Sequence, residues 1–333
     1  MRRIASLARR EREELFLATA HDIKMPEAMT EKDFWVCWVV DYLFHRSPWA
    51  ERMAFKGGTS LSKCYKLIER FSEDIDLILD WRVLGYSASG PWEKRSKTSQ
   101  DKLNKEMDAK TQDFLRDEFV PHLRDDFAQF LTESFDLSID DAEPQTVRFA
   151  YPRIFDDDAI VSVVRMEIGS LAAWTPTQSA VISSYAAERY PRTFETPSTR
   201  VRTVMAERTF WEKVTILHKE AFRTNDKFPT RYSRHYYDLY CMDKSSVKEQ
   251  AYSELGLLER VVHFKTRFYP SKVARYDLAR PGSIRLVPPD PCFPVLMADY
   301  EHMKNMIFGA KPRFEEIMEA LGRMEAEINA LSS

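Results

Sequence analysis

The sequence contains few of the residues that mark a disulfide-bonded or zinc-binding protein. Only four cysteines occur in 333 residues, and they are scattered as Cys37, Cys64, Cys241 and Cys292. No two of them form a Cys-x-x-Cys pair, and none lies beside a histidine. This scatter argues against a zinc site and against a disulfide framework.

The chain also lacks an excess of charge and any long apolar run. Its 49 basic and 52 acidic residues leave a net charge of −3, so contact with nucleic acid would require a local patch. No apolar stretch approaches the roughly 20 residues of a membrane span, and the amino terminus lacks the apolar core of a signal peptide. We therefore expect a soluble, cytoplasmic protein with no membrane partner.

Glycine is scarce too, and two of the nine glycines are adjacent, Gly57 and Gly58 in the run FKGGTSLSK. We expect a short strand over 53–56, a turn at Gly-Gly-Thr-Ser and a helix over 61–69. Bare backbone N–H groups and the positive end of a helix dipole suit a phosphate. The run is not a Walker A loop, because Lys63 comes too late, and an ordinary tight turn is the alternative.

Two carboxylates follow shortly, Asp74 and Asp76 in the expected strand 74–80. Alternate residues of a strand share a face, so these side chains should project together. They repel each other unless a cation lies between them, and Mg²⁺ binds carboxylates together with substrate phosphates. Solvated edge charges are the alternative. A glycine turn, a helix and this strand together predict two-metal nucleotidyl transfer.

Such a site usually takes a third carboxylate, and Glu167 in the expected strand 160–169 is the candidate. Its sequence neighbours are apolar, an unusual setting for an unpaired acid. A salt bridge to Arg165, two residues away on the same face, is the alternative. The sequence alone does not decide between the two.

Two residues of the carboxyl-terminal half also stand out. Lys213 falls on an apolar helix face, where a lysine is costly unless paired; it either reaches a triphosphate or extends along the helix edge. Asp238 is four residues from Arg234, so an intrahelical ion pair is the simple interpretation, and orientation of Lys213 or Arg234 near the phosphates is the functional one. The lysine-rich segment 94–110 is either a solvated surface or a place for a polynucleotide backbone.

The other patterns predict an α/β protein. The first 45 residues should be helical, with a helix starting at Thr30-x-x-Asp33. Segment 176–202 is expected to be an irregular crossing, and the chain should be mainly helical from residue 204. We expect a nucleotidyltransferase domain with a small mixed sheet over 1–175, and a helical domain over 203–333 that completes the active-site cleft.

The run FKGGTSLSK followed by RFSEDIDL resembles the first motif of the AbiEii/AbiGii-type nucleotidyltransferase toxins, within the DNA polymerase β-like superfamily. Further similarity covers most of the chain from Glu31 to Asn329. It includes segments 31–34, 207–213, 234–239 and 299–303. The first motif is specific and the later ones are moderately so.

The resemblance implies an enzyme that transfers a nucleoside monophosphate from a nucleoside triphosphate to RNA, with the tRNA 3′ end as the expected acceptor. It implies a cognate antitoxin in a type IV toxin–antitoxin or phage-defence system. Two Mg²⁺ ions are expected, with Mn²⁺ as a substitute. A protein or small-molecule hydroxyl as acceptor, or a non-catalytic nucleotide-binding module, remain alternatives.

The resemblance also assigns residues. The expected catalytic residues are Asp74, Asp76, Lys213 and Asp238. The expected nucleotide-binding residues are Gly57, Gly58, Thr59, Ser60, Lys63, Arg70 and Lys213. The expected metal ligands are Asp74, Asp76 and Glu167.

Overall fold

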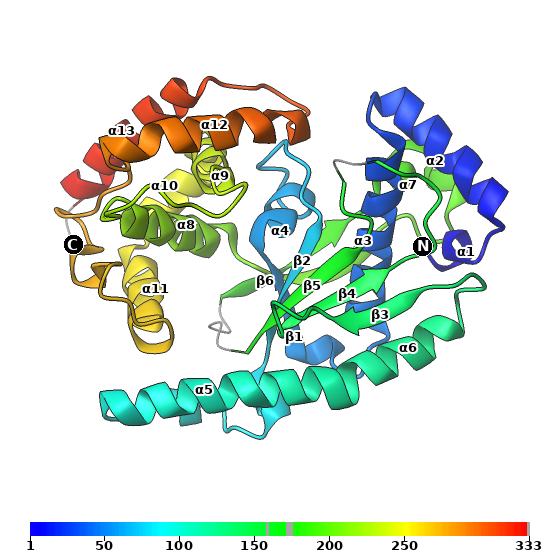
Figure 1. The fold of residues 1–333 in the computed structure, drawn as a ribbon, viewed down its shortest axis with the longest axis horizontal. Coiled ribbons are helices and arrows are strands. Elements are labelled where there is room, and N and C mark those ends of the chain that lie inside the picture. The colour runs from blue at the N-terminus through cyan, green and yellow to red at the C-terminus, as the bar shows by residue number, and fades with distance from the viewer. Residues whose placement is uncertain (158–159, 171–175, 332–333) are drawn as a thin grey trace. The chain divides into compact units, whose positions relative to one another are not determined.

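The computed structural model describes residues 1–157, 160–170 and 176–331, which form two compact units (Figure 1). The first unit comprises Met1–Cys64 and Ser72–Val204, and the second comprises Tyr65–Phe71 and Met205–Ser333. The chain therefore enters the second unit briefly after the glycine motif and returns to it after residue 204.

One mixed sheet organises the first unit. Within the described residues its seven strands are β1 (Met53–Lys56), β2 (Asp74–Leu79), β3 (Asp136–Ile139), β4 (Thr146–Ala150), β5 (Val164–Gly169), β6 (Thr177–Ile182) and β7 (Thr199–Val204). They lie in the order β3-β4-β5-β2-β1-β7-β6. The pairs β2–β5 and β1–β7 are parallel, and the other pairs are antiparallel. The α/β prediction is confirmed.

Helix α3 (Glu27–His45) provides the main core of this unit. It is apolar over most of its circumference, which is typical of a buried helix. Trp35 and Trp38 are fully buried and both contact Phe149 of β4, at ring-centroid distances of 5.9 Å. The sheet face that carries Phe55 and Leu77 belongs to the same core. The other helices of the unit are α1 (Arg2–Ala5), α2 (Arg9–Ile23), α4 (Gly57–Lys63), α5 (Lys97–Phe114), α6 (Val120–Ala128) and α7 (Tyr185–Arg189).

Three local predictions are wrong. Helix α3 begins at Glu27, so Thr30 and Asp33 are buried inside it. The helix after β1 begins at Gly57, so Gly-Gly-Thr-Ser is its first turn, and it ends at Lys63. Segment 176–202 is not irregular, because it supplies β6, α7 and most of β7. Its Ser, Thr and Pro content concealed two strands, β6 and β7, which pair with each other, and β7 also pairs with the distant β1.

The second unit is mainly helical, as predicted. It contains α8 (Ala206–Glu220), α9 (Arg234–Asp243), α10 (Ser246–Ser253), α11 (Leu255–Phe268), α12 (Phe293–Met303) and α13 (Phe314–Ala330). Segment 65–71 joins it by backbone hydrogen bonds, from the Phe71 N–H to the Met306 carbonyl at 2.7 Å and from the Phe308 N–H to the Glu69 carbonyl at 2.8 Å. None of the helices that the structure describes is both long and apolar enough to cross a membrane.

Candidate active site

The glycine motif connects β1 directly to α4. Gly57, the first residue of α4, has a φ of +78°, which favours glycine over any residue with a side chain. A Cβ at this position would lie 1.8 Å from Oδ2 of Asp76. Gly57 therefore allows the backbone to approach the carboxylate of Asp76 closely.

The two hydroxyls of the motif are buried and hold the loop together. Thr59 Oγ1 donates to the Asp74 carbonyl oxygen at 2.5 Å and lies 2.9 Å from Ser72 Oγ. Ser60 Oγ donates to the Gly57 carbonyl oxygen at 2.9 Å. The first N–H groups of a helix have no partner within it. The backbone of Gly57, Gly58, Thr59 and Ser60, more than their side chains, is thus the part suited to phosphate.

The three predicted carboxylates lie on two neighbouring strands. Asp74 and Asp76 alternate with buried Ile75 on β2, so they share a face, as predicted. In the parallel β2–β5 ladder, Asp76 is directly opposite Glu167 and Asp74 is opposite Arg165. The structure therefore brings Glu167 beside the Asp pair.

Among these three carboxylates, Glu167 is the one whose negative charge is opposed by its surroundings. Burial, followed by repulsion from Asp76 and Asp74, raises its pKa to about 7. Arg165 is a weak compensation, because its guanidinium is 4.0 Å from Glu167 and 3.8 Å from Asp74, while it contacts Glu143 at 2.6 Å. The predicted alternative, a salt bridge from Arg165 to Glu167, is therefore present only as a long contact, because Arg165 lies closer to Glu143.

This donor set suits a divalent cation, although it is not preassembled. Among residues 1–157, 160–170 and 176–331, no three His, Cys, Asp or Glu side chains are arranged as a ready metal site. The carboxylate oxygens of Asp74, Asp76 and Glu167 are nevertheless the ligand type that Mg²⁺ prefers. Their mutual repulsion is a charge excess that a cation relieves, so the residues fit Mg²⁺ in their chemistry.

Gly57→Ala is expected to destabilise the protein and displace Asp76. The positive φ alone costs about 1–3 kcal/mol for a non-glycine residue, and the added Cβ overlaps the Asp76 carboxylate. Gly169→Ala in β5 is the matched control, because a Cβ there meets nothing within 4 Å. Thermal denaturation of both variants measures the difference, and equal stability would contradict the close approach of Gly57 to Asp76.

Glu167→Gln is expected to stabilise the metal-free protein increasingly as the pH rises. The folded state holds the Glu167 proton up to about pH 7, whereas the unfolded state releases it near the ordinary value of 4.5. Wild-type stability should therefore fall between these values. Because the side chain is 42% exposed, solvent screening reduces the effect to about 1 kcal/mol. Melting temperatures at pH 5 and pH 8 test this, and a constant difference between the proteins would contradict it.

Lys63, predicted to bind nucleotide, lies in a buried ion pair. Its ammonium pairs with Asp33 of α3, lies 3.7 Å from the centre of the Tyr185 ring and donates to the Ser183 carbonyl oxygen at 3.3 Å. Burial opposes its charge, but Asp33 outweighs burial, and the pKa of Lys63 is raised. These contacts fix the end of α4.

A second buried cluster lies wholly within the second unit and unites three predicted residues. Asp238 of α9 is fully buried. It accepts two hydrogen bonds from Arg70, at 2.7 and 2.8 Å, and its Oδ2 is 2.7 Å from Nζ of Lys213 on α8. Lys213 Nζ also lies 3.4 Å from Nδ1 of His235. Lys213 is therefore paired rather than extended along the helix edge.

The electrostatics of this cluster follow from one carboxylate between two cations. Burial alone would raise the pKa of Asp238, but Arg70 and Lys213 hold it well below its usual range. Burial lowers the pKa of Lys213, and Asp238 only partly opposes this effect. Asp238 thus holds the guanidinium of Arg70 and the ammonium of Lys213 together, and a pair of cationic groups is suited to an anionic ligand.

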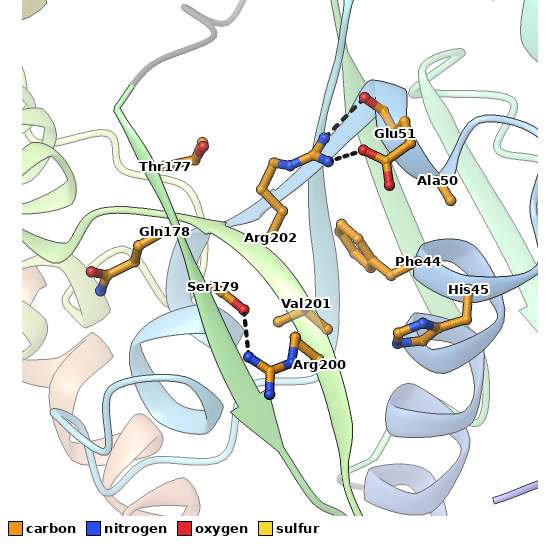
Figure 2. Close-up of a pocket in the computed structure, with 10 residues that line it drawn as sticks. All are labelled: Phe44, His45, Ala50, Glu51, Thr177, Gln178, Ser179, Arg200, Val201 and Arg202. Atoms are coloured by element: carbon orange, nitrogen blue, oxygen red, sulfur yellow. Dashed lines mark hydrogen bonds and ion pairs between the residues drawn. The ribbon is translucent and has the colours of Figure 1, made fainter.

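One pocket of the first unit lies apart from the predicted site residues. It has a volume of about 420 Å³ and lies between the end of α3, β6 and β7 (Figure 2). Its lining is Phe44, His45, Ala50, Glu51, Thr177, Gln178, Ser179, Arg200, Val201 and Arg202. No predicted site residue lines this pocket.

In the lysine-rich segment, Arg95 donates to the Gly90 carbonyl at 2.6 Å and Lys110 pairs with Glu106 at 3.1 Å.

The sequence analysis missed the charged partners that hold the motif in place. Lys32 contacts Glu73, the residue before Asp74, and Asp33 contacts Lys63. One signal was available, because Glu31, Lys32 and Asp33 directly precede a nearly continuous apolar run. Charges near the start of a buried helix require partners, but the sequence does not identify those partners.

Comparison with known proteins defines the class of this chain. The sequence matches the model of the nucleotidyl transferase AbiEii toxin family, of type IV toxin–antitoxin systems, over residues 41–320. This match covers most of the chain, so the protein belongs to the AbiEii family and is a nucleotidyltransferase. Membership implies a nucleotide substrate and an antitoxin partner.

One solved structure similar to this chain is MenT4, a nucleotidyltransferase toxin from Mycobacterium tuberculosis H37Rv. The two share 13% sequence identity with a TM-score of 0.41, and the alignment covers 96% of this chain and 99% of that chain. A comparison with curated protein sequences gave no match.

Proposed function

We propose that this protein transfers a nucleoside monophosphate from a nucleoside triphosphate to an RNA hydroxyl, with the tRNA 3′ end as acceptor, in a metal-dependent reaction. The observation that carries the proposal is the group of Asp74, Asp76 and Glu167 on two adjacent strands, beside Gly57. Closely spaced carboxylates next to a helix start are the parts that triphosphate chemistry requires. Family membership supplies the reaction class.

The roles follow from the contacts. Asp74, Asp76 and Glu167 would hold Mg²⁺, or Mn²⁺ in its place. Such ions, when bound, neutralise phosphate charge and activate the attacking hydroxyl. The first turn of α4, from Gly57 to Ser60, would bind phosphate oxygens through its N–H groups. The high pKa of Glu167 means that metal binding must compete with its proton near neutral pH.

Lys213 is proposed to bind the triphosphate, with Asp238 fixing the position of its ammonium. The 2.7 Å contact to Asp238 restricts the lysine, and the cationic groups of Lys213 and Arg70 lie together on Asp238, which favours an anionic ligand. We propose that Arg70 and Lys63 act through the carboxylates that they hold, Asp238 and Asp33, rather than by touching the nucleotide. Both are largely buried by these contacts.

The biological role is proposed from the family. The protein would act in the cytoplasm as the toxin of a type IV toxin–antitoxin or phage-defence system, with a cognate antitoxin opposing it. A protein or a small-molecule hydroxyl is a second acceptor class that the same carboxylates would serve.

Acceptor identity is tested by incubating purified protein with Mg²⁺, each α-labelled nucleoside triphosphate and total bacterial RNA, with Asp76→Ala alongside. We expect label in a tRNA-sized band with the wild type alone. Label on polypeptide would move the acceptor to protein. Absence of label from all fractions, with RNA and protein intact, would contradict the RNA-modifying proposal.

A further inference from the structure

The second turn of α3 carries three consecutive charged residues inside the protein. Glu31 and Lys32 are 0% exposed and Asp33 is 2% exposed. Buried charges are costly unless each is paired and hydrogen-bonded, and each of these contacts a different segment of the first unit. The cluster therefore joins segments that are distant along the chain.

Lys32 is the member that contacts the residues leading into both carboxylate-bearing strands. Its Nζ donates to Oε2 of Glu73 at 2.5 Å and to the carbonyl oxygen of Val161 at 2.5 Å. Glu73 immediately precedes β2, and Val161 lies in the segment that leads into β5. Because β2 and β5 are parallel, both strands begin at the same edge of the sheet. A single ammonium thus links the starts of both strands.

We propose that Lys32 is a positioning residue, which holds β2 and β5 together where they begin and so sets the separation of Asp76 from Glu167. These two residues lie directly opposite each other in the ladder, only a few residues beyond the link. The hydrogen-bonded ladder between β2 and β5 begins at Asp74 and Arg165. The segments just before these residues must therefore be held together by other contacts. The link is structural in itself, and its meaning for metal binding rests on the proposed function.

The flanking charges strengthen this assignment. Asp33 pairs with Lys63 and accepts from the Tyr185 N–H at 2.7 Å, so it fixes the end of the helix that begins at Gly57. The carboxylate of Glu31 accepts from the N–H groups of Ile154 and Phe155, at 2.9 and 3.0 Å. The same helical turn therefore holds both the carboxylate strands and the helix of the glycine motif.

Lys32→Met tests the link, because it keeps an unbranched apolar stem and removes the ammonium. We expect amide hydrogens over 72–77 and 162–167 to lose protection from exchange. The Mn²⁺ concentration for half-saturation, measured by electron paramagnetic resonance, should rise about tenfold, as for other residues that orient metal ligands. In activity assays, the metal concentration needed for half-maximal activity should rise by a larger factor than the factor by which kcat at saturating metal falls.

Arg12→Met is the matched control. Arg12 is also buried in the first unit and pairs with Glu133 at 2.6 Å, yet it contacts the start of neither strand. Its replacement should leave exchange over 72–77 and 162–167, and the Mn²⁺ affinity, unchanged. Equal effects of both variants would show general loosening and overturn the proposal.

The double variant Lys32→Met/Glu73→Met separates positioning from simple stabilisation. In Lys32→Met the buried carboxylate of Glu73 loses the ammonium of Lys32. The double variant removes this carboxylate as well, so thermal stability should recover. The Mn²⁺ requirement should remain raised, because the Val161 carbonyl has no link to β2. The proposal would be overturned if the double variant recovered both its thermal stability and its Mn²⁺ affinity. It would also be overturned if folded Lys32→Met showed unchanged amide hydrogen exchange over 72–77 and 162–167. A wild type that binds Mn²⁺ but transfers no nucleotide would contradict the proposed function, while exchange and Mn²⁺ affinity still decide this inference.

Discussion

Asp76→Asn is expected to lower nucleotidyl transfer by about 10³-fold, because metal ions stabilise transition-state charge by several kcal/mol. Asp76 is the carboxylate that touches Gly57 and faces Glu167, so it lies at the centre of the candidate site. The asparagine keeps the shape and removes the charge. Repulsion within the group decreases, so the folded protein should be at least as stable as the wild type. Initial rates and melting temperatures measure the two effects separately.

Glu143→Gln is the matched control for Asp76→Asn. It also removes one negative charge close to Glu167, since Glu143 repels Glu167 and contacts Arg165 at 2.6 Å, but it lies outside β2 and β5. Activity should remain within a few-fold of the wild type, because Glu143 is exposed and surface ion pairs contribute little. If Glu143→Gln lost as much activity as Asp76→Asn, net charge around Arg165, and not metal ligation by Asp76, would explain the result.

Asp238→Asn is expected to destabilise the protein by about 3–5 kcal/mol, because it leaves Arg70 and Lys213 buried without their counter-charge. The pKa of Asp238 lies below its usual range, so this stability is present above the ordinary carboxyl pKa of 3.8 and is lost only as the pH falls below it. Transfer should also fall, since Lys213 loses the contact that orients it. Denaturant unfolding at pH 7 measures the first effect, and the KM for the nucleoside triphosphate measures the second.

Arg234→Ala is the control for Asp238→Asn, and it also tests the sequence interpretation. Helical spacing favours an Arg234–Asp238 pair, whereas the structure pairs Asp238 with Arg70 and Lys213. We expect Arg234→Ala to change stability by less than about 1 kcal/mol, because this half-buried arginine is not one of the two cations that hold Asp238. A loss equal to that of Asp238→Asn would favour the intrahelical pair and contradict the buried cluster.

Local patterns predicted the parts of this site that depend on neighbouring residues. Alternation along one strand was sufficient to place Asp74 and Asp76 on one face. Glu167 was predicted from its apolar neighbours, and the parallel ladder places it opposite Asp76. The adjacent glycines predicted a turn at Gly57, although the helix begins there, one turn earlier than predicted.

The contacts that hold the site could not be predicted, because they join residues far apart in the chain. Arg70 and Asp238 are separated by 168 residues, and Lys32 and Val161 by 129. Spacing rules describe partners within a turn of helix or across a hairpin. They therefore predicted ion pairs between Arg234 and Asp238 and between Arg165 and Glu167. Strand β7 escaped prediction for the same reason, since it pairs with the distant β1, while β6 pairs with β7 itself.

Paired incubations with α-labelled and γ-labelled nucleoside triphosphate test the central claim most directly. The claim is that this AbiEii-family protein transfers a nucleoside monophosphate to RNA with the carboxylates of β2 and β5. We predict that α-label enters RNA, that γ-label is released as pyrophosphate, and that Mg²⁺ removal or Asp76→Asn abolishes both. Transfer of γ-label to RNA, or α-label transfer unaffected by Mg²⁺ removal and by Asp76→Asn, would contradict the account.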